Sequence, residues 1–308
     1  MTRILVLSDT RLPTLPVGGH GLGRCSVDIA NGLRARGHSV HIGFGPGSIA
    51  PDGIESMTHL SERQRAEELA RLFTGGAPIW EAVVDLSHAH DLSRILPDAP
   101  VVNYMMDDEC RHVPSSCVVG NAWLQRKFKG SRIVPLGVDV AHIPFNPTGG
   151  DRLLFAAKLC FEKGPDIALN VAATAGLEID IYGTPFGASI KSAKPEITDL
   201  ATFYDVLGCA RAFLAPYRYD SGSRVVLEAA AAGTPVITLD WCGTCEHVLD
   251  GVSGFVCGTA GEMAEAVGVV DKLDRRQARE WVRETHSMAV MIGALNEAIN
   301  AVAAGDGW

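Results

Sequence analysis

Two carboxylates mark the segment of this chain with the clearest potential for chemistry. Asp220 follows Ala212–Ala215, a short apolar run typical of a buried strand, and Glu228 lies within Arg224–Ala232, an alanine-rich stretch that predicts a helix. Burying Glu228 among alanines is costly unless it forms hydrogen bonds, for example with the diol of a ribose. The two acids therefore indicate a site for a nucleotide and a sugar.

The loop between the two acids is made of small residues and leads into the predicted helix. Such a loop leaves backbone N–H groups exposed at a helix N-terminus, where the unpaired donors and the helix dipole both attract a phosphate. The candidate donor-binding residues of this loop and helix start are Ser221, Gly222, Ser223, Arg224 and Val225. A simpler interpretation stays open for Asp220, which could merely cap the helix.

Short runs rich in valine and isoleucine alternate with helical periods along the chain, which is the pattern of parallel strands joined by crossover helices. In the first half, strands are predicted at Arg3–Leu7, Val40–Phe44, Ala82–Leu86, Val101–Tyr104 and Cys117–Val119, with helices after Gly23 and at Glu62–Phe73 and Ala122–Phe128. In the second half, strands are predicted at Leu153–Ala157, Ile179–Tyr182, Ala212–Ala215 and Pro235–Thr238, with helices at Thr198–Cys209, Arg224–Ala232 and from Glu262 to the end. The pattern predicts an α/β protein.

Proline and glycine gather between residues 135 and 150, where the periodicity stops, and this composition is typical of a linker between domains. A chain of 308 residues is long enough for two domains. We therefore expect one Rossmann-like domain over residues 1–140 and a second over residues 151–285.

Composition limits the partners of the chain. The formal charge of -9 and the isoelectric point near 5.6 oppose binding to the phosphates of nucleic acid. The N-terminus lacks the features of a secretory signal, and the sequence has no uninterrupted apolar stretch of about 18 residues, so we expect a cytoplasmic protein. The eight cysteines are scattered along the chain and are expected to be reduced thiols. An oligomeric state is not indicated.

The segment Ala215–Ile237 resembles the retaining GT-B glycosyltransferases of the glycogen-synthase and phosphatidylinositol-mannosyltransferase type. The signature of that family is Glu-x7-Glu followed by Ala-(Met)-Ala-x-Gly-x-Pro-Val, and Asp220 and Glu228 match its two acids. The resemblance implies that Asp220 meets hydroxyls of the donor sugar and that Glu228 holds the ribose. The chain departs from the family at Asp220 and at Ser221–Arg224, where the usual residues are Gly-Phe-Gly-Leu.

The resemblance also covers Leu154–Gly164, which is similar to the family segment Gly-Arg-Leu-x-x-Glu-Lys-Gly. In the family two cations of this segment clamp the donor diphosphate, and Lys158 and Lys163 match them, with Lys158 in place of the usual arginine. Two cations can stabilise a departing diphosphate without a metal. The resemblance thus implies no cofactor, with a nucleotide diphosphate sugar as the co-substrate.

In the first half, Gly18 and Gly19 open a glycine loop that resembles the family loop over the phosphates and the reaction centre. Ser87–Asp91 resembles the family segment His-x-His-Asp, which implies a role at the donor sugar for His90 first and His88 second. Without the resemblance, the glycines are as well explained by a tight turn, and the histidines by ordinary packing.

Cys242-Gly-Thr-Cys245, followed by His247 and Cys257, invites a zinc or redox interpretation. A single Cys-x-x-Cys lacks the second pair of ligands that a structural zinc site requires, so we expect no metal here. The segment falls where the family has a loop beside the donor, which makes Gly243 a candidate donor-binding residue. The acidic triplet at Asp107 is expected to be a solvated loop.

Taken together, the resemblance predicts two Rossmann-like domains facing a cleft, with residues 286–308 returning as a helix to the first domain. It implies a metal-independent hexosyltransferase that moves a sugar from a UDP- or GDP-linked donor to a hydroxyl acceptor, which could be a small molecule, a glycan or another molecule. Retention of the anomeric configuration is implied by the resemblance alone. Two alternatives stay open: a catalytically weak protein that binds a nucleotide sugar or glycan, and a nucleotide-sugar epimerase.

Overall fold

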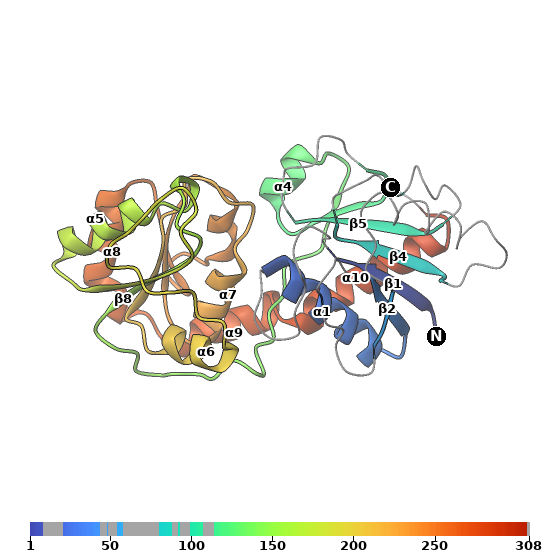
Figure 1. Ribbon diagram of the computed structural model, residues 1–308, viewed down its shortest axis with the longest axis horizontal. Coiled ribbons are helices and arrows are strands. Elements are labelled where there is room, and N and C mark those ends of the chain that lie inside the picture. The colour runs from blue at the N-terminus through green and yellow to red at the C-terminus, as the bar shows by residue number, and fades with distance from the viewer. Residues whose placement is uncertain are drawn as a thin grey trace. The chain divides into compact units, whose positions relative to one another are not determined.

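A computed structural model of the chain describes residues 1–8, 21–43, 48, 54–57, 80–87, 92, 99–106 and 114–306. The contacts divide the chain into two compact units, each described here by itself (Figure 1). Unit 1 comprises Met1–Pro135 together with Met288–Trp308, and unit 2 comprises Leu136–Ser287. The chain therefore enters unit 2 once and returns to unit 1 for its final helix.

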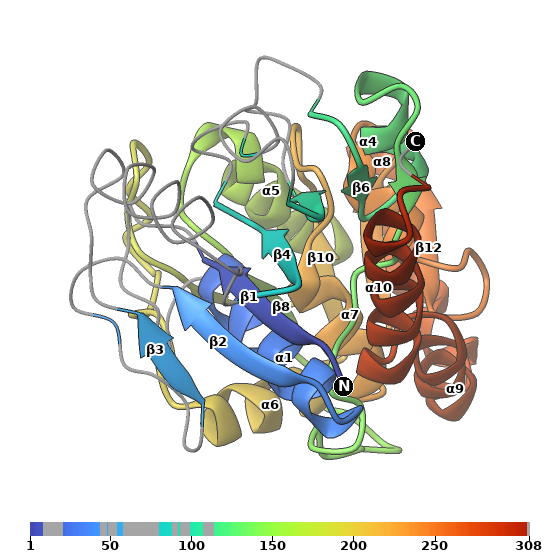
Figure 2. The same ribbon diagram turned by 90° about the vertical axis from the view of Figure 1, so that its right-hand side faces the viewer.

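Unit 1 is built on a parallel sheet with the strand order β3-β2-β1-β4-β5-β6-β7. Its strands are β1 (Arg3–Leu7), β2 (Ser39–Gly43), β3 (Glu55–Met57), β4 (Ala82–Asp85), β5 (Val101–Met105), β6 (Cys117–Val119) and β7 (Arg132–Ile133). Helices α1 (Gly21–Ala35) and α10 (Met288–Ala303) pack against each other and against this sheet (Figure 2). A Cβ atom at Gly32 would lie 2.5 Å from Ile292, so this glycine permits the close approach of the two helices. A short helix, α4 (Ala122–Lys127), is capped by Asn121.

Unit 2 contains a second parallel sheet, with the strand order β12-β11-β10-β8-β9. Its strands are β8 (Leu153–Ala156), β9 (Ile179–Tyr182), β10 (Ala212–Ala215), β11 (Val236–Leu239) and β12 (Gly254–Cys257). Its helices are α5 (Pro165–Ala175), α6 (Leu200–Gly208), α7 (Arg224–Ala231), α8 (Ala260–Val269) and α9 (Arg275–Thr285), with short 3-10 helices η1 (Phe161–Lys163), η2 (Gly243–His247) and η3 (Val270–Lys272). Helix α5 packs on α8, and α7 packs on α6 and α9. Within its core, the buried rings of Phe155 and Tyr217 meet edge to face with centroids 6.4 Å apart.

The predicted α/β class with parallel sheets is confirmed, while several details differ. The region from Glu262 onward is not one helix but parts of three, because Asp274 caps α9 by accepting from the backbone of Arg276 at 2.9 Å and the chain leaves helical geometry at His286. Strands β3, β7 and β12 were not predicted. The helix predicted at Glu62–Phe73 lies outside the described residues.

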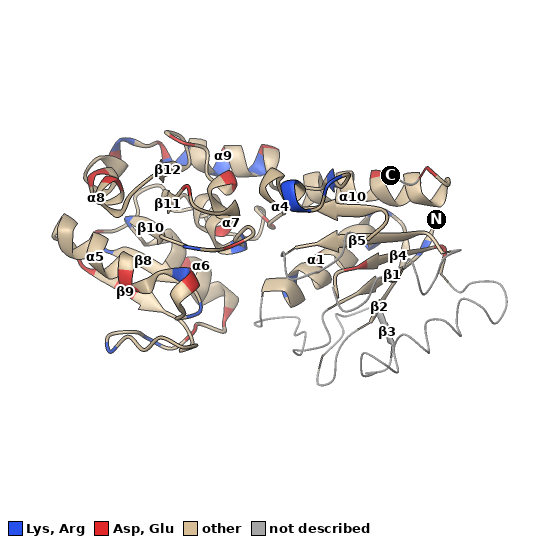
Figure 3. Ribbon diagram, turned by 90° about the horizontal axis from the view of Figure 1, so that it is seen from above, with Lys and Arg blue, Asp and Glu red and all other residues tan. Residues whose placement is uncertain are grey.

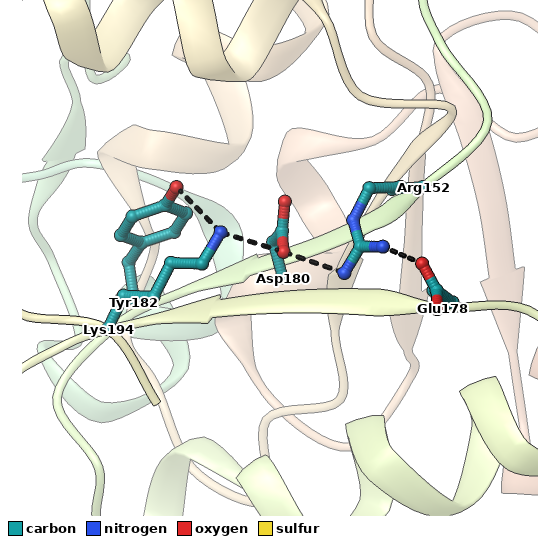
Figure 4. A network of polar contacts seen from close by, with 5 residues as sticks. All are labelled: Arg152, Glu178, Asp180, Tyr182 and Lys194. Atoms are coloured by element: carbon teal, nitrogen blue, oxygen red, sulfur yellow. Dashed lines mark hydrogen bonds and ion pairs between the residues drawn. The ribbon is translucent and has the colours of Figure 1, made fainter. Parts of the chain in front are cut away.

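A network of charged side chains covers the edge strand β9 (Figure 4). The Asp180 carboxylate accepts hydrogen bonds from Arg152 at 2.9 Å and from Lys194 at 3.0 Å, and Arg152 also pairs with Glu178. Lys194 donates to the Tyr182 hydroxyl at 3.3 Å as well. Charged side chains along an edge strand discourage pairing with another sheet. This network also ties the segment after β9 back to the strand.

Helix α9 holds the linker that enters unit 2. The guanidinium of Arg279 donates to the carbonyls of Val140 at 2.6 Å and Ile143 at 2.9 Å in the linker, and to that of Ala231 at 2.5 Å in the last turn of α7. Helix α9 also carries Arg and Glu residues together, as Figure 3 shows.

No helix among the described residues is long and apolar enough to cross a membrane.

We predict that Arg279→Met lowers the free energy of unfolding by about 2–4 kcal/mol, because three carbonyls lose a charged donor. Arg276→Met, at an exposed position of the same helix, is the matched control and should cost less than about 0.5 kcal/mol. Urea unfolding of both variants measures the difference. Equal losses would show that Arg279 does not hold the linker.

Candidate functional site

The turn after β8 presents the first two predicted cations. Lys158 follows the strand and is exposed, whereas Lys163 ends η1 and is half-buried. Gly164 then adopts the left-handed conformation, with φ 62°, and a Cβ atom there would lie 2.2 Å from the Pro216 carbonyl oxygen. Only glycine fits this position. Pro165 starts α5 at the first turn, where its missing N–H is not needed.

The loop after β10 brings Asp220 to Lys163. One carboxylate oxygen of Asp220, Oδ2, forms an ion pair with Lys163 Nζ, and the other, Oδ1, accepts a hydrogen bond from the backbone N–H of Gly222 at 2.8 Å. Lys163 Nζ also lies 4.5 Å from the centroid of the Tyr217 ring, a distance typical of a cation–π contact. The lysine is thus held from two sides, by a carboxylate and by an aromatic face.

Burial dominates the electrostatics of Lys163. The pKa of Lys163 is lowered to about 8, chiefly because removal from water disfavours the ammonium, with a smaller contribution from the nearby Lys158. The Asp220 carboxylate in contact with Nζ favours the charged form and opposes this shift. Lys163 is therefore charged at neutral pH but loses its proton at a lower pH than an exposed lysine does.

Helix α7 carries the second acid. Glu228 is 1% exposed and pairs with Arg224 one turn earlier, with 3.3 Å between Arg224 Nε and Glu228 Oε1. Such a pair balances the charge of a carboxylate inside an alanine-rich helix. At the start of α7, the N-cap residue Ser223 makes no side-chain capping bond, so its hydroxyl does not cover the helix N-terminus. Val225 follows Arg224 in the first turn and is half-buried.

Helix η2 packs directly on the Asp220 loop. The backbone N–H of Gly243 donates to the Asp220 carbonyl at 2.8 Å, and a Cβ atom at Gly243 would lie 2.5 Å from the Ser221 carbonyl. Glycine is therefore required for the two loops to approach. At the other end of η2, the buried His247 lies with Nδ1 3.4 Å from the Ser223 carbonyl. Three segments of unit 2 thus meet around Asp220: η1, the start of α7, and η2.

On the side away from the Asp220 loop, the buried ring of His247 contacts further aromatic side chains. It stacks edge to face on His286 with centroids 5.3 Å apart, and His286 contacts the ring of Trp281 at 5.1 Å. His286 Nδ1 lies 3.0 Å from the Leu136 carbonyl, and the His286 carbonyl accepts from the backbone N–H of Val138 at 2.9 Å. A line of contacts therefore connects the Asp220 loop to both ends of unit 2.

The structure brings most of the predicted residues of unit 2 together and leaves others unplaced. Asp220 contacts Lys163, Gly222 and Gly243, and Arg224 contacts Glu228. Lys158 is near enough to influence the pKa of Lys163, and its ammonium lies 5.6 Å from the ring centroid of Phe186. Four predicted residues of unit 1 lie outside the described residues, namely Gly18, Gly19, His88 and His90.

Sequence reasoning did not select Tyr217 and Phe186, and it considered His247 only as a metal ligand. Tyr217 follows β10 within the motif segment, so its position beside the predicted site was readable. His247 follows Gly243 by four residues, which was a weaker signal. No sequence signal pointed to Phe186, because its placement depends on a backbone hydrogen bond to Leu159, a residue of a distant segment.

The cysteines near the site are free thiols. Cys242 is buried and lies 3.6 Å from the Tyr217 carbonyl oxygen, and burial raises its pKa. Within the ranges that the structure describes, no group of three or more His, Cys, Asp or Glu residues is arranged to hold a metal ion.

Comparison with known sequences identifies a domain in unit 2. Residues 151–270 match the family model described as glycosyl transferases group 1. The chain is 29% identical over 165 residues to a glycogen synthase of Mycobacterium tuberculosis, a match covering 46% of this chain and 39% of the relative. It is 30% identical over 186 residues to a D-inositol 3-phosphate glycosyltransferase of Frankia alni, covering 52% and 42% respectively. The chain thus matches less than half the length of these curated relatives.

Comparison with solved structures covers the whole chain and shows the fold. AviGT4, a glycosyltransferase involved in avilamycin A biosynthesis, superposes with a TM-score of 0.81 at 20% identity and full coverage of both chains. HepE of Anabaena, solved in complex with UDP-glucose, superposes with a TM-score of 0.75 at 15% identity, covering 98% of this chain and 100% of HepE. These are GT-B structures, and the two parallel sheets of this chain match theirs.

The histidine contact generates a prediction about pH. Burial, with a smaller effect of His286, lowers the pKa of His247 from 6.5 to about 3. The unfolded chain binds a proton at this residue below about pH 6.5, while the folded chain stays neutral, so the free energy of unfolding falls as pH drops from about 6.5 toward 3. Each pH unit in this window should cost up to about 1.4 kcal/mol for this residue.

Urea unfolding between about pH 7 and pH 5 measures this loss, and His247→Gln removes the titrating group. The variant should be less stable at neutral pH but less sensitive to acid than the wild type. An unchanged acid sensitivity would mean that His247 does not stay neutral in the folded chain.

Proposed function

We propose that this chain, in which residues 151–270 match the group 1 glycosyltransferases and which has the GT-B fold, transfers a hexosyl unit from a nucleotide diphosphate sugar to a hydroxyl acceptor. The observation that carries the proposal is the meeting of a lysine, an acid and a helix N-terminus at one end of the second sheet. Lys163, Asp220 and the start of α7 lie on segments that follow the neighbouring strands β8 and β10. In parallel α/β sheets, ligands bind outside the carboxyl ends of the strands.

The charges of this site suit a diphosphate. Lys163 and Lys158 supply two positive side chains, and the N-terminus of α7 supplies backbone donors and a favourable dipole. We assign the diphosphate to these groups, together with the loop Ser221–Ser223. Stabilisation of the leaving diphosphate by two lysines would supply what a metal supplies in other transferases.

We assign the ribose to Glu228. Its carboxylate lies one turn below the start of α7 and is balanced by Arg224. Arg224 can hold Glu228 in one position while a ribose diol donates to the carboxylate, because a carboxylate has about four acceptor sites. For the base, uridine is our first choice because HepE was solved with UDP-glucose, with guanosine as the second.

From the family resemblance alone we also assign the first domain to the acceptor, and His90, His88, Gly18 and Gly19, which lie outside the described residues, to the donor. Retention follows the family resemblance and is part of the proposal. A second candidate function is binding of a nucleotide sugar without efficient transfer. The engagement of both Asp220 oxygens favours it, because the acid assigned to the sugar hydroxyls already has two partners.

We predict that UDP-glucose or a related UDP- or GDP-sugar raises the melting temperature of the wild type, and that Lys163→Met and Glu228→Gln abolish this shift while remaining folded. The physical reason is the loss of a diphosphate cation in one variant and of a ribose acceptor in the other. Arg211→Met, whose partner Asp271 lies on η3, is the control and should keep the shift.

Sugar transfer to a panel of hydroxyl acceptors then separates the two functions. Turnover lost in the same variants supports the transferase, and nucleotide binding without turnover supports the binding protein. A free donor that isomerises without acceptor would point to an epimerase. If no nucleotide sugar shifts the melting temperature of the wild type, the proposed site is wrong.

The pKa of Lys163 predicts how donor binding depends on pH. Lys163 is charged below its pKa of about 8, so affinity for UDP should fall as pH rises through 8. Calorimetric titration with UDP across this range measures the effect. Lys163→Arg stays charged and should flatten the profile. An identical alkaline loss in that variant would contradict the assignment of the effect to Lys163.

A further inference from the structure

Both carboxylate oxygens of Asp220 have a partner within its own unit. Its Oδ2 pairs with Lys163, its Oδ1 accepts from the Gly222 N–H at 2.8 Å, and its backbone carbonyl accepts from the Gly243 N–H at 2.8 Å. The side chain is 8% exposed. The carboxylate of Asp220 therefore connects η1 to its own loop, and its backbone carbonyl connects that loop to η2.

The bond from the Asp220 side chain to the backbone two residues later depends on side-chain length. Aspartate and asparagine readily form this turn, because the carbonyl oxygen on Cγ reaches the N–H of residue i+2. Glutamate has one more methylene and does not close the same ring. Aspartate at this position thus shapes the loop Asp220–Ser223 that leads to the N-terminus of α7.

The pair with Lys163 competes with an anionic ligand. Lys163 can approach a diphosphate only by weakening its contact with Asp220, and a diphosphate placed at Lys163 repels the Asp220 carboxylate. Exchange of the lysine from carboxylate to phosphate leaves Oδ2 as an acceptor, which a sugar hydroxyl can fill. Binding of the diphosphate and of the sugar would then be coupled through one ion pair.

We propose that Asp220 is a positioning residue, which holds Lys163 and the Asp220–Ser223 loop in the empty site and passes Lys163 to the donor diphosphate when the donor binds. This inference rests on the proposed function and adds an order of events to it. Asp220 becomes available to the sugar only after Lys163 has left it. The low pKa of Lys163 is in keeping with a lysine that needs one anion or the other beside it.

Asparagine at position 220 separates the two roles of the carboxylate, which are the hydrogen bond from the Gly222 N–H and the ion pair with Lys163. Asp220→Asn keeps the acceptor for the Gly222 N–H and removes the charge that competes for Lys163. We expect it to bind UDP or GDP about 3- to 10-fold more tightly than the wild type near pH 6.5, which corresponds to an ion pair of about 0.7–1.4 kcal/mol. Turnover should fall, because the sugar loses a charged acceptor.

As pH rises, the UDP affinity of Asp220→Asn should begin to fall at a lower pH than that of the wild type. The reason is that the variant has no carboxylate beside Lys163 to favour its charged form. Asp166→Asn is the matched control. It removes a carboxylate that pairs with Arg218 in the same unit, and it should change neither the affinity nor the pH profile. A gain shared by both variants would reflect net charge alone and would overturn the inference.

Calorimetric titration with UDP and GDP gives the affinities, and the melting temperature shows that each variant is folded. If Asp220→Asn does not fold, Asp220→Ser replaces it, because a serine hydroxyl can also accept from the N–H two residues later. A folded neutral variant that binds UDP and GDP no more tightly than the wild type overturns the inference while leaving the donor site intact. A wild type that binds neither nucleotide overturns the proposed function itself.

Discussion

The contact between Lys163 and Asp220 is the interaction on which the arrangement of unit 2 around its candidate site depends. It joins the segment after β8 to the segment after β10, and these strands are neighbours in the sheet although α5, β9 and α6 separate them along the chain. Two glycines make the approach possible, Gly164 beside Pro216 and Gly243 beside Ser221. A mostly buried lysine without this carboxylate would lose part of its charge. The loops that would receive a donor are therefore placed by an ion pair that a donor can replace.

A second ion pair, between Arg224 and Glu228, has a different character. It is more deeply buried and lies within one helix, so the partner of Glu228 is fixed by the helical spacing alone. The first pair is suited to exchange and the second to hold a carboxylate in place. This difference fits a site in which the diphosphate binds Lys163, which exchanges its partner, and the ribose binds Glu228, which Arg224 holds in place. It also explains how an alanine-rich helix can contain a glutamate.

Much of the fold could be predicted from the sequence. Strands β1, β6 and β10 are largely apolar runs with clear breaks, β9 alternates apolar and polar residues, and all four have the predicted bounds. Strand β12 was missed because it begins with Gly254, which reads as a break. That glycine is needed where the strand passes the Val236 backbone, since a Cβ atom would lie 1.8 Å from its carbonyl oxygen. The motif identified Lys163, Asp220 and Glu228, yet the pairing of Lys163 with Asp220 depends on strand order and loop packing, which no local pattern contains.

The most direct test of the account is a crystal structure of the chain with a UDP-sugar bound. We expect the diphosphate between the two lysines after β8 and the N-terminus of α7, the ribose on Glu228, and Lys163 on a phosphate oxygen with its contact to Asp220 broken. A nucleotide bound elsewhere would contradict the assigned donor site. A diphosphate at this site with the Lys163–Asp220 contact unchanged would contradict the exchange while leaving the site in place.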